Sequence, residues 1–181
     1  MMTETEKQFR DVTGKCRAMF EKKLSDYGAA WRLMRPESVT DQIYIKANRA
    51  RSIEVAGVAL VDEDMKSCFE AIVNYGIIAL IQLEKGFSDT TDMPNDEAMD
   101  AYDRHLNEAL QLMLAKNHDY GEAWRQMRVS SYTDLILMKI NRTKQIEDHD
   151  GKTQVSEGVA SNYMDMINYS VFALIKLEHG A

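Results

Sequence analysis

The stretch DYGAAWRLMR, residues 26–35, returns as DYGEAWRQMR at residues 119–128, with eight of its ten letters unchanged. The match extends without a gap over residues 26–53 and 119–146, where 16 of 28 positions are identical. After one inserted residue in the second copy, NYGIIALIQLEKG aligns with NYSVFALIKLEHG. Self-similarity over this length is typical of a chain built from copies of one supersecondary unit. The sequence therefore predicts a tandem duplication.

The composition between the two copies indicates where they join. The segment FSDTTDMPND is polar and contains a proline, as linkers do. We expect a first helical repeat over residues 1–87, a linker over 88–95 and a second helical repeat over 96–181. At 181 residues the chain is long enough to bury a sizeable core, so we expect the two repeats to pack as one globular domain.

Each half predicts three helices. The chain has only two prolines and nine glycines, and it is rich in strong helix formers. Apolar residues recur at three- and four-residue spacing over residues 5–24 and 96–117, which is typical of an amphipathic helix. The last helix of each half, about 62–85 and about 155–178, ends in a nearly continuous apolar run. We expect these last helices to be the most buried.

A second helix is expected between the first and the last. Thr40 and Thr133 are interpreted as its N-caps, because threonine accepts a hydrogen bond from the first turn. The helix is expected to end near Glu54 and Asp148. No alternating polar and apolar run is long enough to predict a strand. The predicted fold is all-α, with two three-helix units packed as a bundle around a pseudo-two-fold axis.

Bulk properties exclude several classes of function. The net charge of −7 argues against coating of DNA or RNA, which requires release of counterions. The apolar runs are shorter than the roughly 18–20 residues of a membrane span, so we expect no membrane partner. Cys16 and Cys68 have neither metal-site spacing nor a disulfide framework, which indicates reduced thiols in the cytoplasm. The oligomeric state is not determined, and a homo-oligomer is compatible with the sequence.

The second helix carries a polar face that could bind phosphate. At about 100° per residue, Asp134, Asn141 and Arg142 lie along one broad face, with Lys139 at its side. Lysine and arginine bind phosphate oxygens, while the acid could orient a base, a sugar or a metal ion. The first-half counterparts of this face are Asp41, Asn48, Arg49 and Lys46.

The last helix supplies further acids. Glu157 and Asp165 are two turns apart on one stripe, and two such carboxylates could share Mg²⁺ or Mn²⁺. An ion pair with an arginine of the neighbouring helix is the alternative. In the first half Glu63 keeps its place, Ala71 aligns with Asp165, and Glu70 stands one position early.

The aromatic and basic residues of the opening motif leave two interpretations. Trp31 and Trp124 fit core positions, because buried aromatic rings contribute much packing energy. The arginines recur although their neighbours change, so they either bind phosphate or form ion pairs with Asp41 and Asp134. These arginines are Arg32, Arg35, Arg125 and Arg128.

The repeated pattern DYGxAWRxMR, S-x-T-D-x-I-x-x-K-x-N-R and NY resembles a family. This is a bacterial and phage helical family first catalogued as a domain of unknown function and later called the nucleotide-modification-associated domain. The resemblance covers both halves, and the second is the fuller match. More distantly, the layout is similar to the all-α nucleoside triphosphate pyrophosphohydrolases of the MazG and dimeric dUTPase group. There, acids in E-x-x-E and E-x-x-D motifs hold Mg²⁺, and a dNTP is cleaved between its α- and β-phosphates. This chain departs from both motifs.

The resemblance implies binding of a dNTP or modified nucleotide, with Mg²⁺-dependent pyrophosphohydrolysis as the enzymatic form of that function. In that form Glu157, Asp165 and Asp134 would hold the metal ion. The competing interpretation is a non-catalytic helical scaffold or adaptor linked to nucleotide modification, with the repeated polar residues in internal ion-pair networks. The phosphates would be bound by Lys139, Arg142, Arg125 and Arg128, and the first-repeat counterparts of the site are Asp41, Lys46, Arg49, Glu63 and Glu70.

Overall fold

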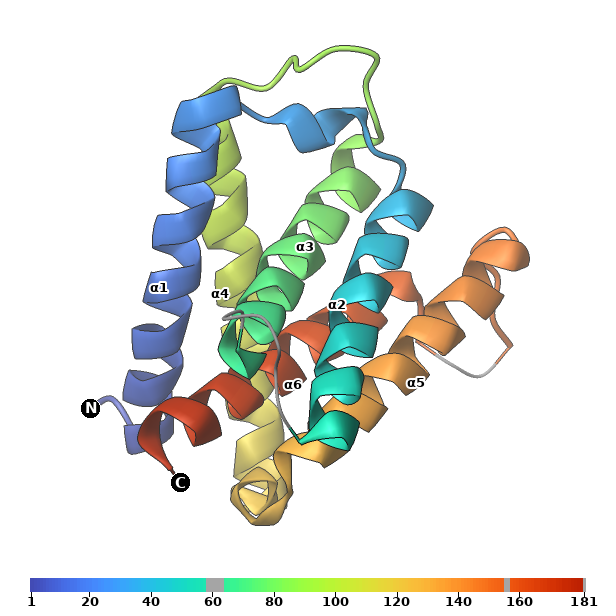
Figure 1. The fold of residues 1–181 in the computed structure, drawn as a ribbon. Helices are drawn as coiled ribbons and strands as arrows, with labels where there is room; N and C mark the ends of the chain where they lie inside the picture. The colour runs from blue at the N-terminus through green and yellow to red at the C-terminus, as the bar shows by residue number, and fades with distance from the viewer. Residues whose placement is uncertain (58–63, 155–156, 181) are drawn as a thin grey trace.

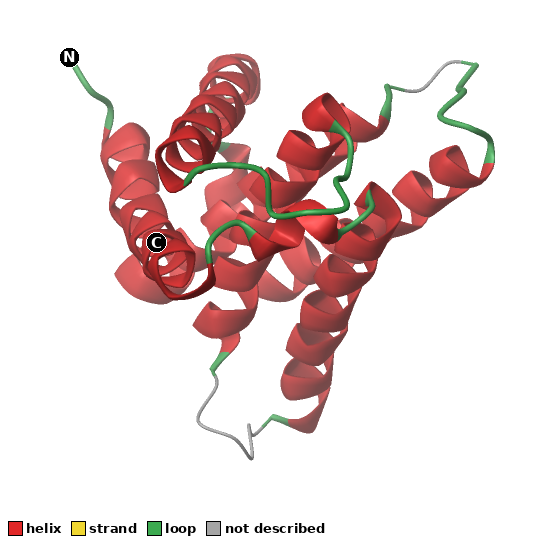
Figure 2. Ribbon diagram, turned by 90° about the horizontal axis from the view of Figure 1, so that it is seen from above, coloured by secondary structure: helices red, strands yellow, loops and turns green. Residues whose placement is uncertain are grey.

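The computed structural model describes residues 1–57, 64–154 and 157–180. Within these ranges every regular element is helical, and none is a β-strand (Figure 2). The all-α prediction is confirmed, and the same order of three α-helices with one 3₁₀ turn occurs in each half. The first half contains α1 (Glu4–Tyr27), η1 (Ala30–Leu33), α2 (Pro36–Ala56) and α3 (Met65–Lys85), and the second contains α4 (Asn95–Tyr120), η2 (Ala123–Gln126), α5 (Val129–Asp148) and α6 (Val159–His179).

The six helices form three layers of two (Figure 1). Helices α3 and α6 cross in the middle layer and pack extensively against each other. On one side, α2 lies on α3, α5 lies on α6, and α2 and α5 contact each other. On the other side, α1 and α4 each contact both middle helices. Every layer therefore combines one helix from each half, and the buried apolar residues form one continuous core.

The middle layer confirms that the last helix of each half is the most buried. In α3, residues 76–82 are all buried, and in α6 residues 165–168 and 170–175 are. By length and composition, α3 is apolar enough to cross a membrane, and within the described residues it alone passes that test. However, 61% of its most apolar window is buried inside the protein. Its position between two other layers therefore accounts for its apolar sequence.

The two middle helices approach closely at Gly76 of α3. A Cβ atom at this position would lie 2.6 Å from Cγ1 of Ile167 on α6, a distance that side chains do not adopt. The aligned residue of the second half is Ser170, which is small and fully buried. The crossing of α3 and α6 therefore depends on the absence of a side chain at position 76.

The predicted N-caps of the second helices are wrong. Helix α2 begins at Pro36 and α5 at Val129, four residues before Thr40 and Thr133. Proline suits the first helical position because its fixed φ is already helical. Both threonines are fully buried inside their helices, with the hydroxyl oxygen 3.2 Å (Thr40) and 3.5 Å (Thr133) from the carbonyl oxygen four residues earlier. The predicted starts of the last helices, Asp62 and Val155, lie outside the described residues.

Candidate functional site

Arg32, the first arginine of the opening motif, holds a turn in place. Its side chain is 5% exposed and pairs with Asp92 at 3.1 Å. The guanidinium also donates to the Gln82 side chain and to the Gly86 carbonyl oxygen. Gln82 in turn donates to the carbonyl oxygens of Arg32 and Met34 at 3.1 and 2.5 Å. Arg32 and Gln82 together bind η1 to the C-terminal end of α3.

Arg125, its counterpart, joins η2 to α1. Its guanidinium lies 4.4 Å from the centroid of the Trp124 ring and pairs with Glu122 at 3.2 Å. It also donates to Thr5 and Gln8, at 2.8 Å each. This guanidinium is therefore held by contacts within the protein, as the ion-pair interpretation predicted, although its acid is Glu122 and not Asp134.

The structure does not bring Arg125 to the predicted phosphate site beside Lys139. Lys176 of α6 binds η2 by donating to the carbonyl oxygen of Arg125 at 2.8 Å. Lys139 instead pairs with Asp165, 11 residues before Lys176 on the same helix, or about 16 Å along its axis. Arg128 is exposed at the N-cap of α5 and, like Arg35 at the N-cap of α2, makes no side-chain capping bond.

Asp41 and Asp134 join the two halves to each other. Asp41 on α2 pairs with Lys144 on α5 at 3.2 Å, and Asp134 on α5 pairs with Arg51 on α2 at 2.6 Å. Lys144 is the aligned counterpart of Arg51, so one contact is made twice in opposite directions. Such reciprocity is what a two-fold arrangement produces. Both aspartates are about two-thirds exposed.

The repeated threonines also contact the other half. Thr133 on α5 donates to the Glu54 carboxylate on α2 at 2.6 Å. Thr40 also contacts the hydroxyl of Tyr163. The repeated Thr-Asp pair is thus explained by packing between the halves.

Asp165 is held between two lysines. Its Oδ1 lies 2.8 Å from Nζ of Lys116 on α4, and its Oδ2 lies 3.0 Å from Nζ of Lys139 on α5. The aspartate side chain is only 7% exposed. A buried carboxylate needs cations or donors on both oxygens, and here the two lysines supply them. Asp165 therefore completes a three-residue bridge across α4, α6 and α5.

The predicted metal ligands are not brought together. Glu157 is exposed and lines, with Lys139 and Arg142, a cavity of about 540 Å³ beside the N-terminal end of α6. Asp134 lies in the α2–α5 layer, and both oxygens of Asp165 are engaged by lysines. In the described parts of the chain, no three His, Cys, Asp or Glu side chains are grouped as a metal site. The set Glu157, Asp165 and Asp134 therefore does not fit a shared Mg²⁺.

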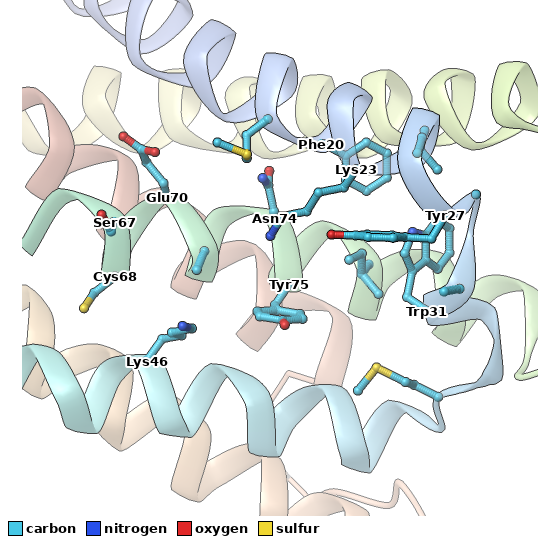
Figure 3. Close-up of a pocket in the computed structure, with 17 residues that line it drawn as sticks. Phe20, Lys23, Tyr27, Trp31, Lys46, Ser67, Cys68, Glu70, Asn74 and Tyr75 are labelled. Carbon is cyan, nitrogen blue, oxygen red and sulfur yellow. The ribbon is translucent and has the colours of Figure 1, made fainter. Parts of the chain in front are cut away.

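A cavity lies in the first half, between α1, α2 and α3 (Figure 3). Its volume is about 580 Å³, which is within the range of small-molecule sites. Tyr27 and Trp31 stand at one end and Tyr75 projects from α3 toward α2, so aromatic rings border much of the space. Lys23 of α1 and Lys46 of α2 reach it from opposite sides.

The two lysines at this cavity differ from their counterparts in the second half. Lys23 and Lys46 form no hydrogen bond or ion pair with any residue of the described ranges. They are the aligned counterparts of Lys116 and Lys139, which bind Asp165 in the second half. In the first half the position of Asp165 is occupied by Ala71, which also lines the cavity. Within the described ranges, two ammonium groups therefore border this cavity without a carboxylate that bridges them.

Larger residues stand at the corresponding positions of the second half. Phe172, which aligns with Ile78, stacks on Trp124 with ring centroids 4.4 Å apart and planes 8° apart. Phe172 also contacts Tyr132, which aligns with Val39. Ile78 and Ala71 line the cavity of the first half, and the second half has the larger Phe172 and Asp165 at these positions. The first half is open because its side chains are smaller.

Asn74 and Glu70 form the polar wall of the open cavity. Asn74 donates to the Cys16 carbonyl oxygen at 3.0 Å and accepts from the Tyr102 hydroxyl at 2.7 Å, which fixes its amide. Asn168 makes the matching bond by donating to the Ala109 carbonyl oxygen at 3.0 Å. Burial, followed by the charge of nearby acids, raises the pKa of Glu70 above its usual value. Glu70 is the carboxylate that lines the cavity.

The structure places only some of the predicted first-repeat site residues at the cavity. Lys46 and Glu70 line the cavity, whereas Asp41 faces the other half and Arg49 is not among the lining residues. Glu63 lies outside the described residues. Lys23 was not identified from the sequence. The ungapped alignment of the halves begins at Asp26, and extending it by three residues toward the N-terminus pairs Lys23 with Lys116.

Comparison with known families gives a match in each half of the chain. The family model described as nucleotide modification associated domain 1 matches residues 23–83 and again residues 116–177. The two matched segments are consistent with a duplication, and the first of them begins at Lys23. Comparison with the curated proteins and with the solved structures gives no match.

Proposed function

Since the chain belongs to the family described as nucleotide modification associated domain 1, we propose that its first half binds a nucleotide or nucleotide-like phosphate. The site of this proposal is the cavity between α1, α2 and α3. The observation that carries it is the pair Lys23 and Lys46, two cations without a partner among the described residues, at the border of an aromatic cavity.

The lysines suit the phosphate part of such a ligand. Two like charges at one cavity repel each other, and an anion between them relieves that repulsion. Charge-assisted hydrogen bonds from ammonium to phosphate are about twice as strong as neutral ones. The net charge of the whole chain is −7, so the attraction for an anion is local to these two side chains.

The aromatic residues suit the base. Tyr27, Trp31 and Tyr75 border the same cavity as the lysines (Figure 3). A nucleobase presents a flat π-face, and stacking of a base on an aromatic side chain contributes about 1–3 kcal/mol. Tyr27 is 63% exposed and is not part of the buried core, so its ring can cover a bound base without disturbing the core. A ring at one end and cations toward the other match a base linked to a phosphate.

A divalent ion would enter this cavity with the phosphates. Glu70 would then be the carboxylate available as an oxygen ligand, and Mg²⁺ often combines one or two protein carboxylates with phosphate oxygens. Pyrophosphate release from a nucleoside triphosphate is the activity that the resemblance to pyrophosphohydrolases implies. A panel of nucleotides, assayed for binding and for pyrophosphate release with and without Mg²⁺ or Mn²⁺, tests the divalent ion and the hydrolysis.

The experiment is titration of the protein with nucleosides, nucleotides and inorganic phosphate by calorimetry. Lys23→Ala and Lys46→Ala should each weaken nucleotide binding at least about tenfold, since a charged hydrogen bond contributes about 1.5–3 kcal/mol. The matched control is Lys22→Ala, one residue away on the exposed face of α1 and not among the lining residues. Equal affinity for all three variants would contradict the proposed site.

A non-catalytic scaffold is the second candidate. The observation that favours it is the use of repeated polar residues, Asp41 and Asp134 among them, in contacts between the halves. A scaffold predicts that no member of the panel changes the melting temperature or releases heat on titration. Nucleotide binding that depends on Lys23 would contradict that expectation.

A further inference from the structure

The second half contains a contact that indicates where the ligand's anion lies in the first. Lys116, Asp165 and Lys139 form a closed bridge, whereas their counterparts Lys23, Ala71 and Lys46 border an open cavity. We propose that Asp165 occupies in the second half the place that one phosphate group of the ligand takes in the first. This inference rests on the proposed nucleotide binding. It adds where the phosphate lies, how many phosphate groups the ligand carries and how many binding sites the chain has.

The position follows from the equivalent elements that carry the three residues. Each lysine lies on the first or second helix of its half, and position 71 or 165 lies on the middle helix between them. In the second half the two carboxylate oxygens take one lysine each, at 2.8 and 3.0 Å. The methyl group of Ala71 leaves the place of these oxygens vacant in the first half. An anion with two oxygens over Ala71 would bridge Lys23 and Lys46 in the same way.

The charge of the site selects the ligand class. A phosphate monoester carries about −1.5 to −2 charges at pH 7, which two lysines offset. The further phosphates of a triphosphate would add negative charge beside Glu70, which lines the same cavity. A nucleoside monophosphate combines one such group with a base for the aromatic end. The ligand class is therefore the nucleoside monophosphate, bound more tightly than the triphosphate or the nucleoside.

The second half does not bind this ligand. Asp165 already occupies the anion position, and Phe172 stacks on Trp124 where Ile78 leaves space beside Trp31. One monophosphate per chain is therefore expected in a calorimetric titration. Two equal sites per chain would overturn the inference.

The first test places an aspartate at the position of Ala71. Ala71→Asp should bridge Lys23 and Lys46 internally, so monophosphate affinity should fall at least about tenfold and the melting temperature of the ligand-free protein should rise. Ala71→Asn is the matched control, because it has nearly the same shape without the charge and should not raise the melting temperature. Unchanged monophosphate affinity in Ala71→Asp would overturn the inference while leaving nucleotide binding intact.

The second test empties the anion position of the second half. Asp165→Ala should lower the melting temperature, and inorganic phosphate should restore part of it, beyond the effect of sodium chloride at equal ionic strength. Asp103→Ala, which removes an exposed ion pair with Arg17, is the control that phosphate should not restore. No selective recovery of Asp165→Ala would overturn the inference. If Asp165→Ala does not fold, the Ala71 variants decide.

The two proposals fail in distinguishable ways. If no nucleotide binds the wild-type protein, the proposed function fails, and the phosphate recovery of Asp165→Ala still tests the anion position. If triphosphate binds more tightly than monophosphate, the ligand class is wrong and the proposed function stands.

Discussion

Gly76→Ala tests the crossing of α3 and α6, on which the layered arrangement depends. Two effects oppose each other in this variant. Alanine favours a helix over glycine by about 1 kcal/mol. Against this, the new Cβ would lie 2.6 Å from Cγ1 and 3.2 Å from Cδ1 of Ile167. Cγ1 is near the backbone, so the contact cannot be relieved by moving only the end of the side chain. Overpacking of this kind costs about 1–3 kcal/mol, and we expect a neutral to destabilised protein.

Gly14→Ala is the matched control. Gly14 lies inside α1, and a Cβ there meets no atom within 4 Å. Only the propensity effect remains, so this variant should be more stable than wild type by about 1 kcal/mol. The two variants should then differ by about 1–3 kcal/mol in the free energy of unfolding. At about 2–4 °C per kcal/mol for a chain of this size, their melting temperatures should differ by about 2–12 °C.

The assay is urea unfolding followed by circular dichroism, supported by thermal melts. A further pair of variants isolates the contact, because Ile167→Ala removes both close side-chain atoms and leaves only the Tyr163 carbonyl oxygen, at an ordinary 3.8 Å from the new Cβ. In that background Gly76→Ala should be stabilising, as Gly14→Ala is in the wild type. Equal stabilisation by Gly76→Ala and Gly14→Ala in the wild-type background would refute the close approach of the two middle helices.

Three further predictions concern the polar residues. Burial and neighbouring carboxylates raise the pKa of Glu147 from 4.5 to about 7. The folded state therefore binds this proton more tightly than the unfolded state. The free energy of unfolding should fall as the pH rises from about 4.5 to 7. The Glu147→Gln variant should not show this fall when its free energy of unfolding is measured by urea titration across this pH range. A fall as steep as that of the wild type would contradict the prediction. Arg32→Ala should lower the free energy of unfolding by about 2–4 kcal/mol, because it leaves buried acceptors without a donor. Arg128→Ala, at an exposed position, should change it by no more than about 0.5 kcal/mol. Similar losses for the two variants in urea unfolding would show that burial does not distinguish these arginines. Arg51→Ala and Lys144→Ala should each cost at most about 1 kcal/mol, and less in 1 M salt, because both ion pairs are exposed. A loss above about 2 kcal/mol in either would mean that these pairs do more than surface pairs do.

Local patterns in the sequence were sufficient to predict the helices. The spacing of apolar residues and the near absence of proline act over one or two turns, so they indicate the type and approximate extent of α1 to α6. The continuous apolar ends of α3 and α6 also identified the middle layer correctly. The starts of α2 and α5 were misplaced, since a threonine buried inside a helix and a threonine that caps one are not distinguished by composition alone.

The roles of the repeated polar residues depended on tertiary structure. Asp41 and Asp134 sit on the polar helix face expected of ligand-binding residues, yet each pairs with the other half. The repeat shows that a residue is used in both copies. It does not show whether its partner is a ligand or the other copy, because that depends on which helix packs against its face.

The open cavity depended most on the fold. All its relevant differences are visible in the aligned sequences: Ala71 for Asp165, Ile78 for Phe172 and Val39 for Tyr132. Read along the chain, they are unrelated substitutions on two helices. Packing brings two of these positions to the border of one space with Lys23 and Lys46, and only there does their loss of volume and charge add up to a cavity. Side-chain size is written in the sequence, whereas the space that those side chains share is set by the packing of helices distant along the chain.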